Sequence, residues 1–508
     1  MALNDITFVK GAGGLGRALP GEDYNSGLLL YNNTYPSGFS SSAQVKAVTS
    51  LAAAEALGIT ADYSDETKSA ASIALSAAGS TGDKITITVT EPIVGGTKAV
   101  VIGTYTKVSG DTTTTILATN IAAAINAGTI THGYTAAGAT ANVNITARAG
   151  VGGSLDSGTP LSAVFTGTMA GTITQFTGGV ASKRVVYHYH LKEFFRVQPQ
   201  GVVYVGVFPV PASTYTYAEL ATMQNYAEGK IRQFGIFKDA SYAVGDLTTI
   251  QSVCTSLDDE HKPVSSVLMA ANIKGTSDLT TLSNLATRTD SKCSVVISQD
   301  GGGEGALLYI TCGKSITNLG AALGAVSLAK VSESIAWISK FNISSGTENE
   351  TLAFANGTLY SVTDTNILTV LNNYRYLFLR KFVGISGSYF NDSHTAVATT
   401  SDYAYIENNR TIDKAIRGVY ATLLPDLNGP LLLNSDGTLT DNTIAALTAD
   451  ARPNLDQMVR DGEVSAYAVT IDPAQNVQTT SKVVIAIKLV GVGVARNITV
   501  NIGYTISL

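Results

Sequence analysis

The segment Val202-Val-Tyr-Val-Gly-Val-Phe208 decides the fold class of this 508-residue chain. Three more short, largely apolar runs follow it, at 234–237, 264–269 and 294–297. Continuous apolarity in strands this short is typical of burial on both faces, which is the usual situation in parallel sheets. Between the runs, residues such as Leu220, Met223 and Ala227 recur at helical spacing, as crossovers between parallel strands require. The sequence therefore predicts an α/β core with a largely parallel sheet.

Residues 69–180 differ sharply in composition from the rest of the chain. Eight of these 112 residues are charged, against 64 of the other 396. Within the segment, Ile85, Ile87 and Val89 alternate with threonines, which is typical of strands with one buried and one solvated face. Apolar residues spaced four apart, followed by Gly128, predict one short helix between the strands. We therefore expect an inserted β-rich, sandwich-like module that carries one helix.

The last hundred residues combine helical and strand patterns. An apolar stripe at helical spacing, which includes Ile412 and Ile416, ends at Pro425. A second helical window runs from Asp441 to Gly462. The chain then closes on a period-two pattern of apolar residues: Ile498, Val500, Ile502, Tyr504, Ile506 and Leu508. These patterns predict an α+β C-terminal domain that ends in a long strand.

Together the patterns predict a mixed α/β fold, because a core sheet, an inserted β-sandwich-like module and an α+β C-terminal domain follow one another along the chain. A chain of this length fits about three domains. The expected parts are a linker arm at 1–20, an α/β core at 21–68 plus 181–390, the inserted outer module at 69–180 and the C-terminal domain at 391–508.

The composition excludes several classes of protein. Charged residues make up 14% of the chain and hydrophobic residues 45%, a balance that rules out intrinsic disorder. The formal net charge of −6 argues against a general nucleic-acid binder. No apolar stretch approaches the ~18 residues of a membrane span, so we expect no membrane insertion. The three cysteines form no CxxC pair and suit neither a disulfide framework nor a zinc cage.

The segment Gly11-Ala-Gly-Gly-Leu-Gly16 matches the dinucleotide-binding pattern GxGxxG. That chemistry requires a helix that begins at the last glycine, so that its N–H groups meet the pyrophosphate. Pro20 and Gly21 follow within five residues, and no helical period appears. We therefore interpret the segment as a bent, flexible arm and expect no cofactor.

His188 and His190 would share one face of a strand and could then form half of a metal site. The same segment is equally consistent with a helix, which would separate the two rings. We therefore expect no metal. Cys254 and Cys293 fall on apolar patterns, which favours small core residues over nucleophiles.

The glycine-rich loop Asp300-Gly-Gly-Gly-Glu304 follows an apolar run, where α/β folds often place ligand sites. It lacks the Lys-Ser/Thr of a phosphate-binding loop, and no second acid, base or nucleophile can be assigned to it. A tight strand-to-helix loop without catalytic residues is the simpler interpretation. An α/β enzyme with its site near Asp300 and Glu304 is the alternative.

Arg410, Lys414 and Arg417 recur at positions i, i+4 and i+7, on the helix face opposite the stripe of Ile412 and Ile416. They form a basic ridge on an acidic protein. A solvated helix face, an acidic protein surface as partner, and nucleic acid are three interpretations of this ridge, in decreasing order of preference.

Two groups of short segments carry a family resemblance. At the start they are Asn4-Asp-Ile-Thr-Phe-Val9, Gly13-Gly-Leu-Gly-Arg17 and Gly27-Leu-Leu-Leu-Tyr31. At the end they are Asn409-Arg-Thr-Ile-Asp-Lys-Ala-Ile-Arg417, Arg452-Pro-Asn-Leu-Asp456, Gly462-Glu-Val-Ser-Ala-Tyr467 and the closing strand. These segments resemble the contractile tail sheath proteins of bacteriophages and related contractile injection systems. Residues 69–180 resemble a β-rich module that recurs in phage tail proteins.

The resemblance implies a structural subunit and no enzyme. Sheath subunits stack as rings around an inner tube and contract into a wider, shorter helix that drives the tube through a target cell envelope, for genome ejection in a phage. The implied partners are further copies of the chain, the inner tail tube protein, and baseplate and tail terminator proteins, without direct nucleic-acid contact. The implied location is the virion tail, assembled in the host bacterial cytoplasm. The C-terminal domain would face the tube, which makes Arg410, Lys414 and Arg417 candidate tube contacts.

The two chain ends are candidate links between subunits, because a strand added to a neighbour's sheet stays paired while whole subunits rotate. The closing strand has no proline, and no charge follows Arg496, so an unpaired edge there would invite aggregation. Glycines let the N-terminal arm bend. The candidate exchange residues are Ile6, Phe8, Ile498, Val500, Ile502, Tyr504 and Ile506.

A phage adhesin or glycan-binding tail protein that uses the β-rich module is a further alternative. Such a protein would show period-repeats or an aromatic-lined carbohydrate surface. The module has few aromatic residues and no repeat. The sheath hypothesis is therefore preferred.

Overall fold

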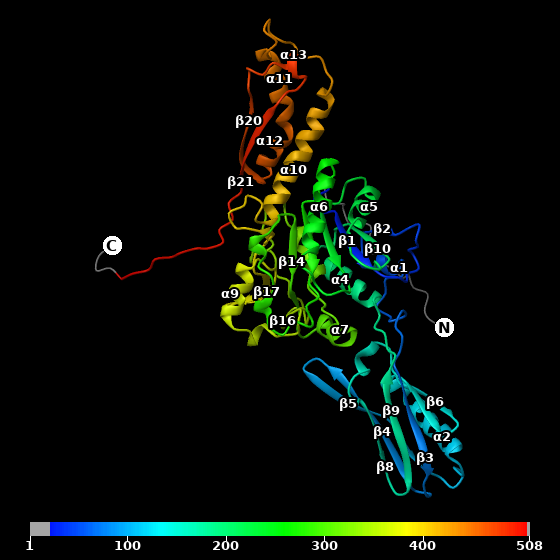
Figure 1. Cartoon of the computed structure of the whole chain (residues 1–508). Helices are drawn as coiled ribbons and strands as arrows, with labels where there is room; N and C mark the ends of the chain where they lie inside the picture. Colours follow the sequence, from blue (N-terminus) through cyan, green and yellow to red (C-terminus); the bar gives the residue numbers. More distant parts are fainter. Residues whose placement is uncertain (1–20, 505–508) are drawn as a thin grey trace, which may run out of the picture.

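A six-stranded sheet forms the centre of the molecule (Figure 1). The structure is a computed structural model and describes residues 21–504. The sheet order is β14 (Cys293–Val296), β12 (Ser266–Ala270), β11 (Gln233–Phe237), β1 (Ser26–Tyr31), β10 (Val203–Phe208) and β2 (Val45–Val48). All pairs are parallel except the edge pair of β10 with β2. The mixed fold and the parallel sheet that the apolar runs predict are confirmed.

Helices cover both faces of this sheet, because its strands are apolar on both sides. In β1, Leu28 and Leu30 belong to one buried cluster, whereas Leu29 and Tyr31 belong to another. The first cluster is completed by α1 (Leu51–Ala56), α4 (Arg184–Val197), α7 (Glu304–Cys312) and α8 (Leu319–Leu328). The second is completed by α5 (Glu219–Tyr226), α6 (Asp246–Asp259) and α9 (Thr365–Asn373). This two-faced burial is what continuous apolar runs require.

Short antiparallel strand pairs surround the central sheet. They are β13 (Thr289–Asp290) with β19 (Ala396–Val397), β15 (Ser298–Asp300) with β16 (Leu352–Phe354), and β17 (Leu379–Phe382) with β18 (Ile385–Phe390). The loop after β18 and the loop before α10 (Ile406–Leu423) lie next to each other, since the amide of Ile406 donates to the carbonyl oxygen of Ser393 at 2.9 Å. Arg496 binds at this junction, to Asp392 and Glu407.

The low-charge segment forms two small sheets with a core of their own at one end of the molecule (Figure 1). One sheet has the order β6 (Thr135–Ala139), β7 (Asn142–Thr146), β3 (Ala70–Ala78), β9 (Met169–Thr177). The other has the order β5 (Gly96–Thr106), β4 (Lys84–Ile93), β8 (Leu161–Phe165). Helices α2 (Thr114–Ala127) and α3 (Thr129–His132) accompany them. The main helix ends at Gly128, as the sequence predicts.

The opposite end of the molecule consists of helices and a two-stranded sheet. Helix α10 leads from the core into this part, which also contains α11 (Asp441–Ala451), α12 (Pro453–Arg460), α13 (Val477–Thr480), β20 (Val464–Ile471) and β21 (Ile485–Gly491). Strands β20 and β21 pair antiparallel. Their inner face packs on Ala415, Leu455 and Met458. Among residues 21–504, no helix is both long and apolar enough to cross a bilayer.

Beyond β21 the chain leaves the body of the subunit as a tail, residues 492–504, visible as the red trace in Figure 1. No strand is assigned to this tail within the described residues. Of the candidate exchange residues, Ile6, Phe8 and Ile506 lie outside the described part of the chain.

Candidate interaction site around helix α10

The basic ridge of α10 lies against the segment that leads into β1, not against solvent. Its three cations all contact Asp23: Lys414 and Arg417 meet the carboxylate, and Arg410 meets the main-chain oxygen. The distance from Asp23 Oδ2 to Lys414 Nζ is 2.8 Å, and that from Asp23 Oδ1 to Arg417 Nη2 is also 2.8 Å. Arg410 Nη2 donates to the main-chain oxygen of Asp23 at 3.1 Å. Three successive helical turns therefore hold one residue of the N-terminal segment.

Further contacts satisfy the rest of the ridge inside the subunit. Arg410 is 2% exposed, and its Nη1 donates to the carbonyl oxygens of Ala329 at 3.0 Å and Lys330 at 3.2 Å. Lys414 Nζ also lies 2.6 Å from Glu463 Oε1, just before β20. The expectation of an exposed basic ridge is therefore wrong for Arg410. Its carbonyl partners are distant in sequence and leave no local pattern.

The apolar stripe on the other side of α10 is more exposed than the sequence pattern predicts. Ile416 is 53% exposed and Tyr420 is 40% exposed. The ring of Tyr420 stacks on His261 at a centroid distance of 4.4 Å. The helix is thus held to the core by polar contacts more than by its apolar stripe.

Burial and charge compete in setting the pKa values of this group. Burial alone would raise the pKa of Asp23, but Lys414, Arg417 and Arg410 lower it below the ordinary value of 3.8. Burial lowers the pKa of Arg417 to about 10, and the nearby positive charge of Arg232 adds to this effect. Arg417 is therefore charged at neutral pH, and Asp23 is ionised.

A cleft of about 1140 Å³ lies beside the ridge, where the loops before β11 and β12 approach α10. Its lining includes Asp23, Arg232, His261, Lys330, Arg417 and Tyr420. Cations and carboxylates both line it in number, so its charge favours no particular class of ligand.

A second group of contacts holds Arg496, at the root of the tail. Arg496 Nε lies 3.0 Å from Asp392 Oδ1, and its Nη2 lies 2.5 Å from Glu407 Oε1. The guanidinium stacks on the ring of Tyr405, 3.4 Å from the centroid. Burial raises the pKa of Glu407, and the charge of Arg496 only partly offsets this. No local sequence pattern predicts this group, although Arg496 is the last charged residue of the chain.

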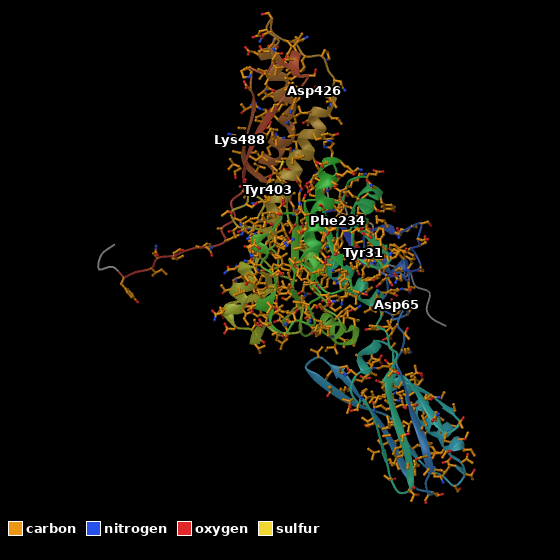
Figure 2. All side chains as sticks on the ribbon, viewed as in Figure 1. Tyr31, Asp65, Phe234, Tyr403, Asp426 and Lys488 are labelled. Atoms are coloured by element: carbon orange, nitrogen blue, oxygen red, sulfur yellow. The ribbon has the colours of Figure 1, made fainter. Side chains whose placement is uncertain are left out.

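The tail beyond Arg496 presents its apolar residues to solvent. The exposed fractions are 80% for Ile498, 70% for Val500, 91% for Ile502 and 110% for Tyr504. Figure 2 shows the tail side chains standing free of the subunit body, and Lys488 marks the nearby strand β21. Within the described residues, β20 and β21 pair only with each other, so each has a free outer edge.

The loop that suggested an enzyme is held by structural contacts. The carboxylate of Asp300 accepts hydrogen bonds from the amides of Gly302 at 3.3 Å, Gly303 at 2.6 Å and Asn349 at 3.1 Å. Glu304, the first residue of α7, pairs with Lys192. Burial raises the pKa of Asp300. A carboxylate bound to three amides in this way organises the strand-to-helix loop.

The two histidines lie on α4 and do not converge. His188 Nε2 lies 2.8 Å from Glu55 Oε1. His190 is fully buried, and burial lowers its pKa to about 3. Cys254 and Cys293 are buried and free. No group of three potential metal ligands occurs among residues 21–504.

Two family models together span nearly the whole chain. The N-terminal domain of DUF2586 matches residues 4–394, and the C-terminal domain of DUF2586 matches residues 402–508. The chain belongs to the DUF2586 family. The description of this family names no function, and a search of curated proteins found no match for this DUF2586 protein.

Structural neighbours of the DUF2586 chain at low sequence identity include a sheath tail protein and chains of contractile injection systems. The sheath tail protein Lin1278 from Listeria innocua has a TM-score of 0.40 at 12% identity, with 94% of this chain and 96% of that chain covered. A chain of the contracted PVC sheath complex, an extracellular contractile injection system, has a TM-score of 0.42 at 13% identity, with 63% and 80% covered. A chain of the anti-feeding prophage baseplate has a TM-score of 0.40 at 14% identity, with the same coverage.

We expect Asp23→Asn to lower the stability of the fold by about 1–3 kcal/mol at neutral pH, because the partly buried Arg417 loses its carboxylate and the partly buried Lys414 keeps Glu463 but loses Asp23. The folded-state pKa of Asp23 lies below its unfolded value of about 3.9. The contact therefore stabilises the fold fully above that pH, and its contribution disappears as the pH falls through the folded pKa. The difference in stability between the wild type and the Asp23→Asn variant should thus become smaller in acid.

Thermal unfolding midpoints measured from pH 3 to pH 7 check this expectation. Asp402→Asn, which changes an exposed carboxylate before α10, is the matched control and should leave the midpoint unchanged. A wild-type-to-Asp23→Asn difference that stays constant over the whole range would contradict the assignment.

Proposed function

We propose that this chain is a structural subunit of a contractile tail sheath, which polymerises around an inner tube and contracts to drive that tube through a target cell envelope. The observation that carries the proposal is the exposed tail, whose alternating apolar residues lie beyond a two-stranded sheet with free edges. The sequence resemblance of both chain ends to sheath proteins supports the same conclusion. The subunit would belong to a virion tail or a related injection device.

The link between subunits would be strand addition. A tail that alternates apolar and polar residues can pair with the free edge of β20 or β21 in a second copy and bury one face. The period-two pattern fixes the register, because a slip of one residue would expose the apolar face. Burial of the four described apolar residues at about 1.5–3 kcal/mol each is comparable with the estimated 4–15 kcal/mol cost of association. Single links would be marginal, and many simultaneous links would make the assembly stable.

The N-terminal arm would provide a second link. Ile6 and Phe8 are its exchange residues, and this part of the proposal rests on the sequence alone. The described chain begins at Gly21, two residues before the carboxylate that α10 holds. An arm that begins at this point would be anchored by the contacts of Asp23 with Lys414 and Arg417.

The basic ridge would have a further role as a contact to an acidic inner tube. Arg410 is buried, so the tube contact would fall to Lys414 and Arg417, whose side chains are 24% and 18% exposed. These two cations would have to share Asp23 with tube carboxylates. Such pairs are weak singly, about 0–1 kcal/mol when exposed, and a sliding interface can break them. Baseplate and tail terminator proteins would contact the two ends of the assembled sheath.

A role as an enzyme has no observation in its favour. Asp300 and Glu304 are engaged in loop and ion-pair contacts. We therefore propose that the chain has no catalytic residue and that contraction uses free energy stored in subunit contacts.

We expect the double variant Val500→Asp/Ile502→Asp to remain a folded monomer that cannot form tubes. The tail side chains are largely exposed in the subunit, so the fold should not change, whereas two charges on the apolar face would prevent its burial in a neighbour. Negative-stain electron microscopy for striated hollow tubes, with circular dichroism and size-exclusion chromatography, is the measurement.

The matched control is Thr499→Asp/Asn501→Asp, which places the same charges on the opposite face of the same strand. This control should still assemble. Tubes of wild-type appearance from the Val500→Asp/Ile502→Asp variant would disprove strand addition through this face, and failure of both variants would point to a simple charge effect.

We also propose that residues 69–180 are an inserted domain on the outside of the sheath wall. The segment has its own buried cluster, which includes Ile73, Ile85 and Leu117. Its two ends meet at a backbone bridge, where the amide of Thr67 donates to Val180 O at 3.0 Å and the amide of Val180 donates to Thr67 O at 2.8 Å. A module joined at one point crosses to its host only twice.

Deletion of residues 69–180 and closure with a short Gly/Ser linker should leave tube assembly intact. The short span between the two ends favours such a closure. Electron microscopy of the deletion variant tests this expectation. Tubes with a normal inner diameter that lack their outer layer would support the assignment, and an unfolded or non-assembling remainder would show that the module is part of the wall.

A further inference from the structure

Helix α10 contacts one residue near each end of the described chain, Asp23 and Arg496. Asp23 follows shortly after the arm of residues 1–20, and it is held by the face of α10 that carries Lys414 and Arg417. Arg496 lies two residues before the exposed Ile498, and it is held by Glu407 in the first turn of the same helix. Two segments more than 470 residues apart in the sequence therefore share one anchor.

Polar contacts, more than apolar ones, hold residues 406–415 of α10 against the rest of the molecule. The buried residues of α10 are Ile406, Glu407, Asn409, Arg410, Thr411, Asp413 and Ala415. Asp413 pairs with the buried Lys292 at 2.6 Å, and Ser393 Oγ donates to Glu407 Oε2 at 2.6 Å. A helix docked by ion pairs depends on their joint geometry, because a buried charge that loses its partner is strongly destabilising.

The residues that bind Arg496 are themselves held in place by the buried Arg375. Arg375 is 1% exposed, donates to Thr395 O at 2.9 Å, and lies 5.1 Å from the centroid of the Tyr405 ring. Arg496 stacks on the same ring. Asp392 and Glu407 then supply carboxylates to its guanidinium from two different segments. Removal of Arg496 would leave the buried Glu407 without its cation.

We infer that α10 couples the two chain ends, so that loss of contacts at the root of one end loosens the root of the other. Glu407 and Arg410 are three residues apart, about 4.5 Å along a helix that rises 1.5 Å per residue, and Arg417 is about 15 Å from Glu407. Within this distance an α-helix moves as a rigid element. A shift of its first turn therefore moves Arg410, Lys414 and Arg417 relative to Asp23.

Through this coupling, strain on the strand that one chain end adds to a neighbour would reach the strand at the other chain end of the same subunit. That use rests on the proposed sheath function, whereas the coupling itself is a property of the free subunit. It can therefore be measured without assembly.

Amide hydrogen exchange on the full-length free subunit tests the inference. Arg496→Gln should speed exchange about tenfold at the amides near Asp23, such as Asn25, which donates to Glu22 O at 3.0 Å, and Arg232, which donates to Asn25 O at 3.0 Å. By reciprocity, Asp23→Asn should speed exchange at Ile406, whose amide donates to Ser393 O beside Arg496.

Two further variants define the outcomes. Arg460→Gln on α12 removes an exposed cation whose side-chain hydrogen bonds within residues 21–504 go to Gln457, and it should change neither region. Arg496→Lys keeps the charge and should give an intermediate effect in a folded protein, even if Arg496→Gln does not fold. Faster exchange confined to residues 391–409 in the Arg496 variants, with the amides near Asp23 unchanged, would overturn the coupling and leave the proposed sheath function untouched.

Discussion

Asp23 lies between the cations of three successive turns of α10, and this contact joins the entrance of the central sheet to the base of the C-terminal domain. Strand β1 follows directly and is an inner strand of the six-stranded sheet. Helix α10 continues beyond the core and positions the pair β20–β21. Because the apolar stripe of α10 is partly exposed, the ionic contact is an important determinant of how these two parts are oriented.

The tail imposes the second constraint. Four large apolar side chains at the described end of the chain are exposed by 70% or more. An exposed segment of this composition, with no proline and no charge after Arg496, is prone to uncontrolled aggregation unless a specific partner covers it. In the proposed strand addition, a second copy of the same chain would offer the free edge that covers this tail.

Part of this structure could be predicted from the sequence. The apolar runs beginning at Val202 predicted the parallel sheet, because burial on both faces leaves a local signature. The spacing of Arg410, Lys414 and Arg417 correctly placed three cations on one helix face, but their partner Asp23 is almost 390 residues away and leaves no periodic trace. The carboxylates that bind Arg496, Asp392 and Glu407, could not be predicted either, because they are also distant in the sequence. Ile416 was expected in a buried stripe, and its exposure follows from polar groups that dock the opposite face of α10.

Cryo-electron microscopy of tubes assembled from the purified chain tests the central claim most directly. The account predicts a helical array in which residues 497–504 of one subunit form a strand along the free edge of β20 or β21 in a neighbouring subunit, with Ile498, Val500 and Ile502 buried. A reconstruction in which these residues fold back onto their own subunit, or in which the neighbouring β20–β21 pair gains no strand, would contradict it.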